Sequence, residues 1–199
     1  MTQAQDIHQP LKQYFGYDQF RPLQEEVIRT VLSGKDALVI MPTGGGKSIC
    51  FQVPALLFKG VTLVISPLIA LMKDQVDGLN ANGIYAAFYN SSQAAGEQHE
   101  ILDQVRSGSL RLLYVAPESL SFLTEVLSEE FVSCIAVDEA HCISSWGHDF
   151  RPSYQRLGFL KTQLPNTPII ALTATADKAT RKDILDQLSI PNAQRFVSS

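Results

Sequence analysis

The chain has 199 residues, of which 45% are hydrophobic and 18% charged, and this balance excludes a disordered or low-complexity protein. Its 16 basic and 20 acidic residues give a formal net charge of −4, unlike a typical nucleic-acid-binding domain, so any DNA contact must come from local residues. The longest apolar stretch is too short to span a bilayer, no secretion signal is visible, and three cysteines without metal-site spacing fit a reducing compartment. We therefore expect a cytoplasmic protein.

Short apolar runs rich in β-branched residues alternate with longer segments of helical periodicity. The expected strands are residues 37–41, 61–66, 84–89, 110–116, 134–138 and 169–173. The expected helices are residues 21–33, 47–58, 67–81, 93–107, 152–163 and 178–188. Continuously hydrophobic strands are typical of a parallel sheet covered on both faces, so we predict one α/β domain over residues 1–199. Ligands of such sheets bind at the carboxyl ends of the strands.

A glycine-rich loop follows the first expected strand and leads into a helix. Its glycines allow successive backbone N–H groups to turn toward an anion, and the helix N-terminus adds partial positive charge. Lys47 can then reach the β- and γ-phosphates, and the Ser48 hydroxyl can ligate Mg²⁺. The predicted phosphate-binding residues are Thr43, Gly44, Gly45, Gly46, Lys47 and Ser48. Because Met41 occupies the first glycine position of the strict pattern, a glycine-rich connector followed by a surface lysine is the alternative.

A pair of carboxylates ends the strand expected at residues 134–138. Asp138 and Glu139 would lie at the carboxyl edge of the sheet, beside the phosphate loop. Asp138 could hold Mg²⁺ through its water shell, and Glu139 could orient and deprotonate an attacking water molecule. The alternative interpretation is an acid-rich helix N-terminus.

Several motifs together resemble a known family. MPTGGGKS and DEAH look like motifs I and II of superfamily 2 helicases, whose first motif commonly lacks the leading glycine; this accounts for Met41. The strings FGYDQFRPLQ, SPLIALMKDQV, APESL, DEAHCISSWGHDFRPSY and ALTATA resemble the RecQ family of DNA helicases, its bacterial members above all, from about residue 11 to the end. The resemblance implies a RecA-like ATP-binding motor domain that uses ATP and Mg²⁺, moves 3′ to 5′ along DNA, and serves recombination and repair.

Gln24 falls within the apolar stripe of the first expected helix. A buried amide needs partners or costs about 1–3 kcal/mol, so a core glutamine satisfied by the backbone is one interpretation. The other is a pair of hydrogen bonds to adenine, which Gln side chains make in DNA recognition. The resemblance favours adenine, and it implies that Tyr17 stacks near the base and that Arg21 assists.

The loop after DEAH carries Trp146, the only tryptophan of the chain, together with His148, Phe150 and Arg151. Trp146, Phe150 and Arg151 could form a hydrophobic plug under the sheet together with Tyr154, or the aromatic rings and the Arg plane could stack on unpaired bases at about 1–3 kcal/mol per base. The resemblance implies single-stranded DNA sensing, in which Trp146, Phe150 and Arg151 touch DNA and His148 links the loop to Glu139.

Three further segments follow expected strands. Ser66, with Pro67 at a first helical position, is expected to cap a helix, as Pro22 is expected to begin one and Gly34 to follow its end. The resemblance also implies DNA-backbone contacts from the loops of Ser66 and Asn90. Thr173 and Thr175 could form an ordinary turn, but they match motif III, which is thought to transmit the nucleotide state to the DNA side.

The resemblance also concerns regions that these 199 residues do not contain. Phosphoryl transfer often needs an arginine finger, which helicases of this superfamily take from a second RecA-like domain. Neither that domain nor the family's zinc-binding region is recognisable here. We therefore expect a monomer, associated with the nucleoid, that binds nucleotide and single-stranded or junction DNA, hydrolyses ATP weakly and does not unwind. The alternatives are a nucleotide- or DNA-binding module without activity of its own and another P-loop enzyme, such as a small-molecule kinase.

Overall fold

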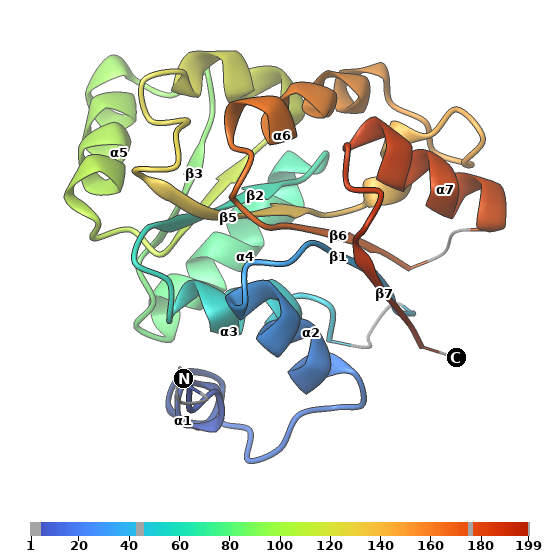
Figure 1. Cartoon of the computed structure of the whole chain (residues 1–199). Coiled ribbons are helices and arrows are strands. Elements are labelled where there is room, and N and C mark those ends of the chain that lie inside the picture. Colours follow the sequence, from blue (N-terminus) through green and yellow to red (C-terminus); the bar gives the residue numbers. More distant parts are fainter. Residues whose placement is uncertain (1–4, 43–45, 175–176, 199) are drawn as a thin grey trace.

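The computed structural model describes residues 5–42, 46–174 and 177–198, and these residues contain one sheet of seven strands (Figure 1). The strands are β1 (Ala37–Ile40), β2 (Val61–Ile65), β3 (Ala86–Tyr89), β4 (Leu112–Val115), β5 (Val132–Val137), β6 (Ile169–Thr173) and β7 (Gln194–Val197). Their order across the sheet is β3-β4-β2-β5-β6-β1-β7, and every neighbouring pair is parallel. The carboxyl ends of all seven strands therefore lie along one edge.

Helices cover both faces of this sheet (Figure 1). One face carries α2 (Gln24–Leu32), α3 (Ile49–Ala55) and α4 (Ile69–Ala81), and the other carries α5 (Ala95–Ser107), α6 (Leu160–Gln163) and α7 (Lys178–Gln187). Three 3-10 helices also pack on the second face: η2 (Pro117–Leu123), η3 (Ala140–Ile143) and η4 (Pro152–Phe159). At the N-terminus lie α1 (His8–Pro10) and a short π-helix, η1 (Leu11–Phe15). The predicted α/β class is confirmed.

The strands are hydrophobic along their whole length because alternate residues enter two different cores. In β1, Leu38 and Ile40 belong to the core under α5 and α7, whereas Ala37 and Val39 belong to the core under α2 and α3. All four are at most 5% exposed. This two-sided burial is what a parallel sheet between two helical layers requires.

The predicted strands are all present, although most are shorter at their ends. The strand β7 was not expected, because its exposed Gln194 and Arg195 break the apolar pattern; it lies at the edge and pairs only with β1. The single α-helix expected at residues 152–163 was wrong in type, since η4 precedes the short α6. Tyr154 and Leu157 are both 0% exposed, and their spacing of three matches one turn of a 3-10 helix.

Four helix starts were also two or three residues too early: those expected at residues 21, 47, 67 and 93 lie at residues 24, 49, 69 and 95. The helix expected from residue 21 begins at Gln24, because Leu23 has a left-handed φ of 74° that interrupts it, so Pro22 lies outside the helix. The helix expected from residue 67 begins at Ile69 without a side-chain cap, and the Ser66 hydroxyl only accepts a 3.5 Å bond from Leu68 N. By contrast, Gly34 was placed correctly after α2, with a φ of 87° and its N–H donating to Val31 O.

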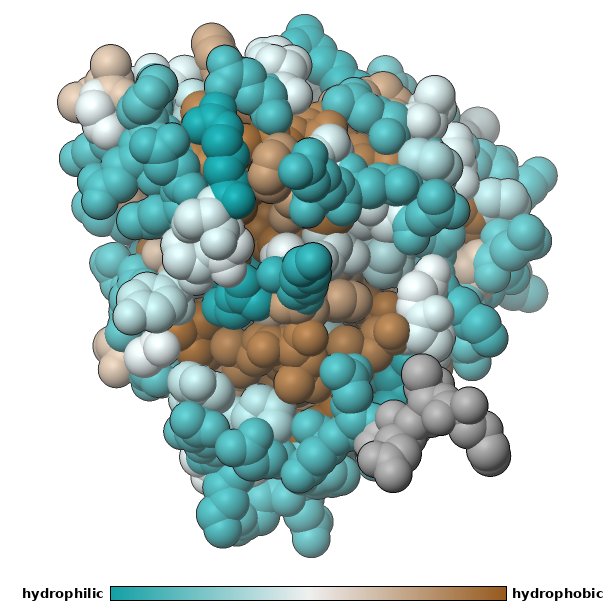
Figure 2. Space-filling view, turned by 60° about the vertical axis from the view of Figure 1, so that its left-hand side comes forward, coloured by the Kyte–Doolittle hydropathy of each residue, from teal (hydrophilic) through white to brown (hydrophobic). Residues whose placement is uncertain are grey.

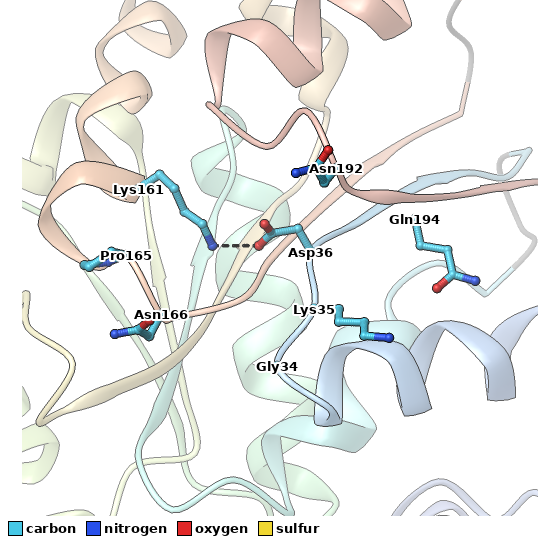
Figure 3. A pocket seen from close by; sticks show the side chains of 8 residues that line it. All are labelled: Gly34, Lys35, Asp36, Lys161, Pro165, Asn166, Asn192 and Gln194. Atoms are coloured by element: carbon cyan, nitrogen blue, oxygen red, sulfur yellow. Dashed lines mark hydrogen bonds and ion pairs between the residues drawn. The ribbon is translucent and has the colours of Figure 1, made fainter.

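The edge of the sheet where the strands begin is held by an ion pair (Figure 3). Lys161 Nζ of α6 donates to Asp36 Oδ1 at 2.8 Å and to Thr167 O at the same distance, while Asp36 Oδ1 also accepts from Ile169 N. The pair ties α6 to the starts of β1 and β6. A polar cavity beside it, lined also by Asn192 and Gln194, lies at the edge opposite the motifs.

The outer surface is largely polar on the side near α5, with apolar residues forming a band between the polar groups (Figure 2). In the part of the chain that the structure describes, no helix is both long and apolar enough to cross a membrane.

Candidate active site

The motifs meet at the carboxyl edge of the sheet because they follow neighbouring parallel strands. The phosphate loop follows β1, the DEAH residues follow β5, and Thr173 ends β6, which lies between those two strands. Thr43, Gly44, Gly45 and Thr175 are outside the described residues.

The phosphate loop begins after Met41, the position where the strict pattern has its first glycine. Met41 still pairs with the sheet, since its N–H donates to Thr173 O at 3.1 Å, and its side chain is 2% exposed in the core. Position 41 is thus an extension of the strand that needs no glycine. Lys47 Nζ donates to Met41 O at 3.2 Å, which brings the ammonium over the strand end, and Ser48 directly precedes α3.

Gln24 connects the first long helix to this loop. Its amide oxygen accepts from Arg21 N at 2.8 Å, and its amide nitrogen donates to Gly46 O at 2.9 Å. Gly46 has a φ of 81°, and a Cβ there would lie 2.4 Å from Gln24 Nε2. A backbone-satisfied glutamine, one of the two interpretations of the sequence, therefore describes this structure.

The same glutamine also lines a small cavity of about 100 Å³ next to the phosphate loop. The lining residues are Tyr17, Gln19, Arg21, Gln24, Gly46 and Ile49. The three residues expected around adenine thus share one hollow, and Tyr17 is 55% exposed at its mouth.

Asp138 is a buried carboxylate at the end of β5. Its N–H donates to Ile65 O, its carbonyl accepts from the Tyr154 hydroxyl at 2.9 Å, and its side-chain oxygen accepts from Glu139 N at 3.0 Å. Burial and then the neighbouring Glu139 charge raise the pKa of Asp138 to about 6, while the Lys47 ammonium opposes that rise. The sequence singled out Tyr154 only as part of the possible hydrophobic plug, because a tyrosine gives no sign of where its hydroxyl will bond.

Glu139 has an unusual backbone conformation, with φ 50° and ψ 44°. Left-handed non-glycine residues cost about 1–3 kcal/mol and are retained where the surroundings impose them, often at functional sites. Here the strained residue lies between β5 and the four-residue η3, so the acids do not begin a regular α-helix.

His141 links the carboxylates to the end of β6. Its Nδ1 is 2.7 Å from Thr173 Oγ1, and its Nε2 is 3.7 Å from Glu139 Oε2. Burial lowers the pKa of His141, against the opposing charge of Glu139, and this favours the neutral ring. The His148 ring stacks on His141 with centroids 4.9 Å apart, so the contact from the loop reaches Glu139 through His141.

The loop after η3 exposes its aromatic side chains. Trp146 is 73% exposed and Phe150 is 36% exposed, so the hydrophobic-plug interpretation is wrong for these two rings. Arg151 Nε lies 3.8 Å from Asp149 Oδ2, and its backbone N–H donates to Cys142 O. The aromatic residue that does enter the core is Tyr154, at 0% exposure.

Ser66 and Asn90, whose loops were predicted to contact the DNA backbone, lie farther along the same edge of the sheet. Ser66 is 3% exposed, so its side chain is not at the surface. Asn90 organises the turn after β3: its Oδ1 accepts from Ser92 N at 3.0 Å and its N–H donates to Gln93 Oε1 at 2.9 Å. The partly buried Asn90 thus shapes a loop at the carboxyl edge.

The chain is similar to known helicases. The family model for DEAD/DEAH box helicases matches residues 21–184. The chain is 57% identical over 192 residues to an ATP-dependent DNA helicase RecQ of Haemophilus influenzae, covering 95% of this chain and 31% of that protein. It is 51% identical over 184 residues to the RecQ of Bacillus subtilis, covering 90% and 31%. The chain thus spans about a third of the length of these relatives.

Solved structures resemble the fold. A hypothetical ATP-dependent RNA helicase from Sulfolobus tokodaii matches with a TM-score of 0.71 at 21% identity, covering 96% of this chain and 56% of that one. The DUF1998 helicase MrfA bound to DNA matches with a TM-score of 0.68 at 17% identity, covering 96% and 28%. The fold is therefore RecA-like.

Proposed function

Because the chain belongs to the DEAD/DEAH box helicase family, we propose that it is the ATP-binding motor domain of a RecQ-type 3′-to-5′ DNA helicase. The observation that carries the proposal is a series of neighbouring groups from Lys47 and Asp138 through Glu139 and His141 to the exposed aromatic loop. Such a series gives one physical connection between a nucleotide site and a DNA-facing loop.

ATP would bind with its phosphates at the loop before α3. Gly46 and Lys47 would contact the phosphates, and Ser48 and Asp138 would hold Mg²⁺. Hydroxyl and carboxylate oxygens are the ligands that Mg²⁺ prefers, so the residues present fit that ion. When bound, the ion would neutralise negative charge on the phosphates.

Glu139 would accept the proton of the attacking water. The neutral His141 beside its carboxylate supports this role, since the imidazole orients the carboxylate without pairing with it as a full positive charge. The hydrogen bond between His141 and Thr173 would carry any shift of Glu139 to the end of β6.

Gln24 would select adenine by exchanging its present partners. Its amide oxygen and nitrogen now bond Arg21 N and Gly46 O, and both would turn to the base edge. Guanine presents an acceptor where adenine presents its N6 amino group, so the same amide would discriminate against GTP. Binding of adenine would thereby release Gly46 and loosen the phosphate loop at the moment when the phosphates enter.

DNA would contact the loop after η3. Trp146 and Phe150 are exposed for stacking on unpaired bases, and Arg151 would add a positive charge that the chain as a whole, at −4, does not supply. Loops at Ser66 and Asn90 would contact the phosphate backbone.

Two measurements test the proposal. Lys47→Ala should abolish tight ATP binding, measured by the fluorescence of a labelled nucleotide, and should abolish DNA-stimulated hydrolysis. The 199 residues alone should hydrolyse ATP slowly and unwind nothing, because an arginine finger worth about 10³–10⁵ in rate would come from a second motor domain. A chain extended through that domain should show strong stimulation by single-stranded DNA. Unchanged hydrolysis in the Lys47→Ala variant would refute the assignment.

A binding module without turnover is the second candidate, and the short span of the chain relative to its relatives favours it for these residues alone. Hydrolysis by the 199-residue chain and by the extended chain distinguishes the two candidate functions. A binding module predicts no DNA-stimulated hydrolysis even in the longer protein.

A further inference from the structure

Three potential metal ligands from η3 and the loop that follows it converge on one point. Cys142 Sγ is 3.7 Å from Asp149 Oδ2, and His141 Nε2 is 3.9 Å from the same oxygen. All three ligand atoms lie within 4.8 Å of one another. None of the three was predicted as a ligand, because residues 141, 142 and 149 do not have the spacing of a familiar metal motif.

The separations are close to those around a tetrahedral zinc ion. With Zn–S near 2.3 Å and Zn–N and Zn–O near 2.1 Å, tetrahedral angles put sulfur and oxygen about 3.6 Å apart and nitrogen and oxygen about 3.4 Å apart. The observed 3.7 and 3.9 Å need only a small contraction.

The surroundings also suit a metal. With the hydrogen on Nδ1, His141 donates to Thr173 Oγ1 at 2.7 Å and leaves the Nε2 lone pair directed at the cluster. Ligating histidines commonly have such an outer partner, which fixes the ring. Cys142 is 0% exposed and His141 is 5% exposed, whereas the Asp149 side chain is 47% exposed and opens the cluster to solvent.

We propose that His141, Cys142 and Asp149 form a binding site for a thiophilic divalent transition ion of the Zn²⁺ type, with water as a fourth ligand. One thiolate, one imidazole and one carboxylate favour such an ion over Mg²⁺, which prefers oxygen alone. On binding, the Cys142 S–H proton leaves to the buffer and the sulfur becomes a thiolate ligand. Arg151, 3.8 Å from the same Asp149 oxygen, is the cation that the incoming ion would displace.

The ion would also act on the neighbouring Glu139, whose Oε2 is 3.7 Å from the same His141 nitrogen. Occupancy would hold His141 on the metal and draw the carboxylate toward it, so we expect micromolar zinc to slow ATP hydrolysis. That consequence rests on the proposed function. The binding itself does not, and it can be tested without nucleotide.

The test uses Co²⁺ as a spectroscopic probe on the metal-stripped chain. A thiolate ligand gives an intense near-ultraviolet charge-transfer band that a Co²⁺ ion held only by oxygen at Ser48 and Asp138 does not give. We expect this band in the unaltered protein, its bleaching by Zn²⁺, and its loss in Cys142→Ser, which keeps a hydrogen-bond donor toward Asp149. The matched control is Cys134→Ser, because Cys134 is equally buried but lies in β5 away from the cluster; it should keep the band.

Two further variants make the result specific. Asp149→Asn should weaken Zn²⁺ binding at least tenfold, and Thr173→Val should weaken it about 10–100-fold by removing the outer partner of His141. Circular dichroism melts establish that each variant is folded. Absence of a thiolate band in the unaltered protein, or its persistence in folded Cys142→Ser, would overturn the proposal.

Discussion

Tyr154→Phe should destabilise the protein and weaken its nucleotide site through one hydrogen bond. The Tyr154 hydroxyl donates to Asp138 O at 2.9 Å, and the side chain is 0% exposed, so water cannot replace the lost donor. Removing it leaves a buried carbonyl unsatisfied, at a cost of about 1–3 kcal/mol. For a chain of this size each kcal/mol shifts Tm by roughly 2–4 °C, so we expect a fall of roughly 2–12 °C.

The functional part of this prediction concerns Glu139, whose left-handed turn begins at the carbonyl that Tyr154 holds. Its matched control is Tyr114→Phe in β4. This change also removes a buried tyrosine hydroxyl, which accepts a hydrogen bond from Gln52 Nε2 at 3.1 Å. Thermal melts should show similar losses for both variants, while hydrolysis in the longer protein should fall more for Tyr154→Phe. An unchanged Tm for Tyr154→Phe, or equal losses of hydrolysis in the two variants, would refute the reasoning.

Three further predictions follow from the site. Burial raises the pKa of Asp138 to about 6, so its protonated form contributes stability that is full below about pH 4 and is lost as the pH rises through 6. Metal-free Asp138→Asn should therefore be more stable than the unaltered chain at pH 8 by about 1–3 kcal/mol, measured as a higher Tm, and should lose this pH dependence. Gly46→Ala should lose more stability than Gly34→Ala, since both need a positive φ but only the first places a Cβ 2.4 Å from Gln24 Nε2; equal melts would show that this contact is unimportant. Trp146→Ala should leave Tm nearly unchanged, because the ring is 73% exposed, and should weaken single-stranded DNA binding by about 1–3 kcal/mol in a fluorescence anisotropy titration, whereas full affinity would remove this ring from the DNA contact.

Much of the fold was predictable because it depends on local patterns. Apolar runs of strand length separated by helical segments identify a parallel sheet, and β1 and β6 were located to within one residue. The failures have specific causes. The left-handed Leu23 shortens α2, and nothing in its side chain indicates that conformation. The edge strand β7 has one neighbour and exposed polar residues, so it lacks the apolar signal of the inner strands.

The candidate site, like the fold, could be predicted from the sequence only in part. Lys47, Ser48 and Asp138 could be proposed as site residues because their residue types follow strands in an order that phosphate chemistry requires, and in these roles they stay predictions. The hydrogen bonds that organise the site could not be predicted. Gln24 bonding to Gly46, Tyr154 to Asp138 and His141 to Thr173 each join segments at least 16 residues apart, and only packing brings such groups within hydrogen-bond distance.

By itself, therefore, the sequence determined the α/β class, the edge of the sheet where the candidate site residues lie, and the types of residue that meet there. These follow from side-chain periodicity and from the shared direction of parallel strands. The tertiary structure alone decided that Glu139 is strained, that His141 stands between the loop and the carboxylates, and that Cys142 and Asp149 share a point with it. Contacts of this kind depend on how η3 packs over the ends of β5 and β6. No local sequence pattern indicates that packing.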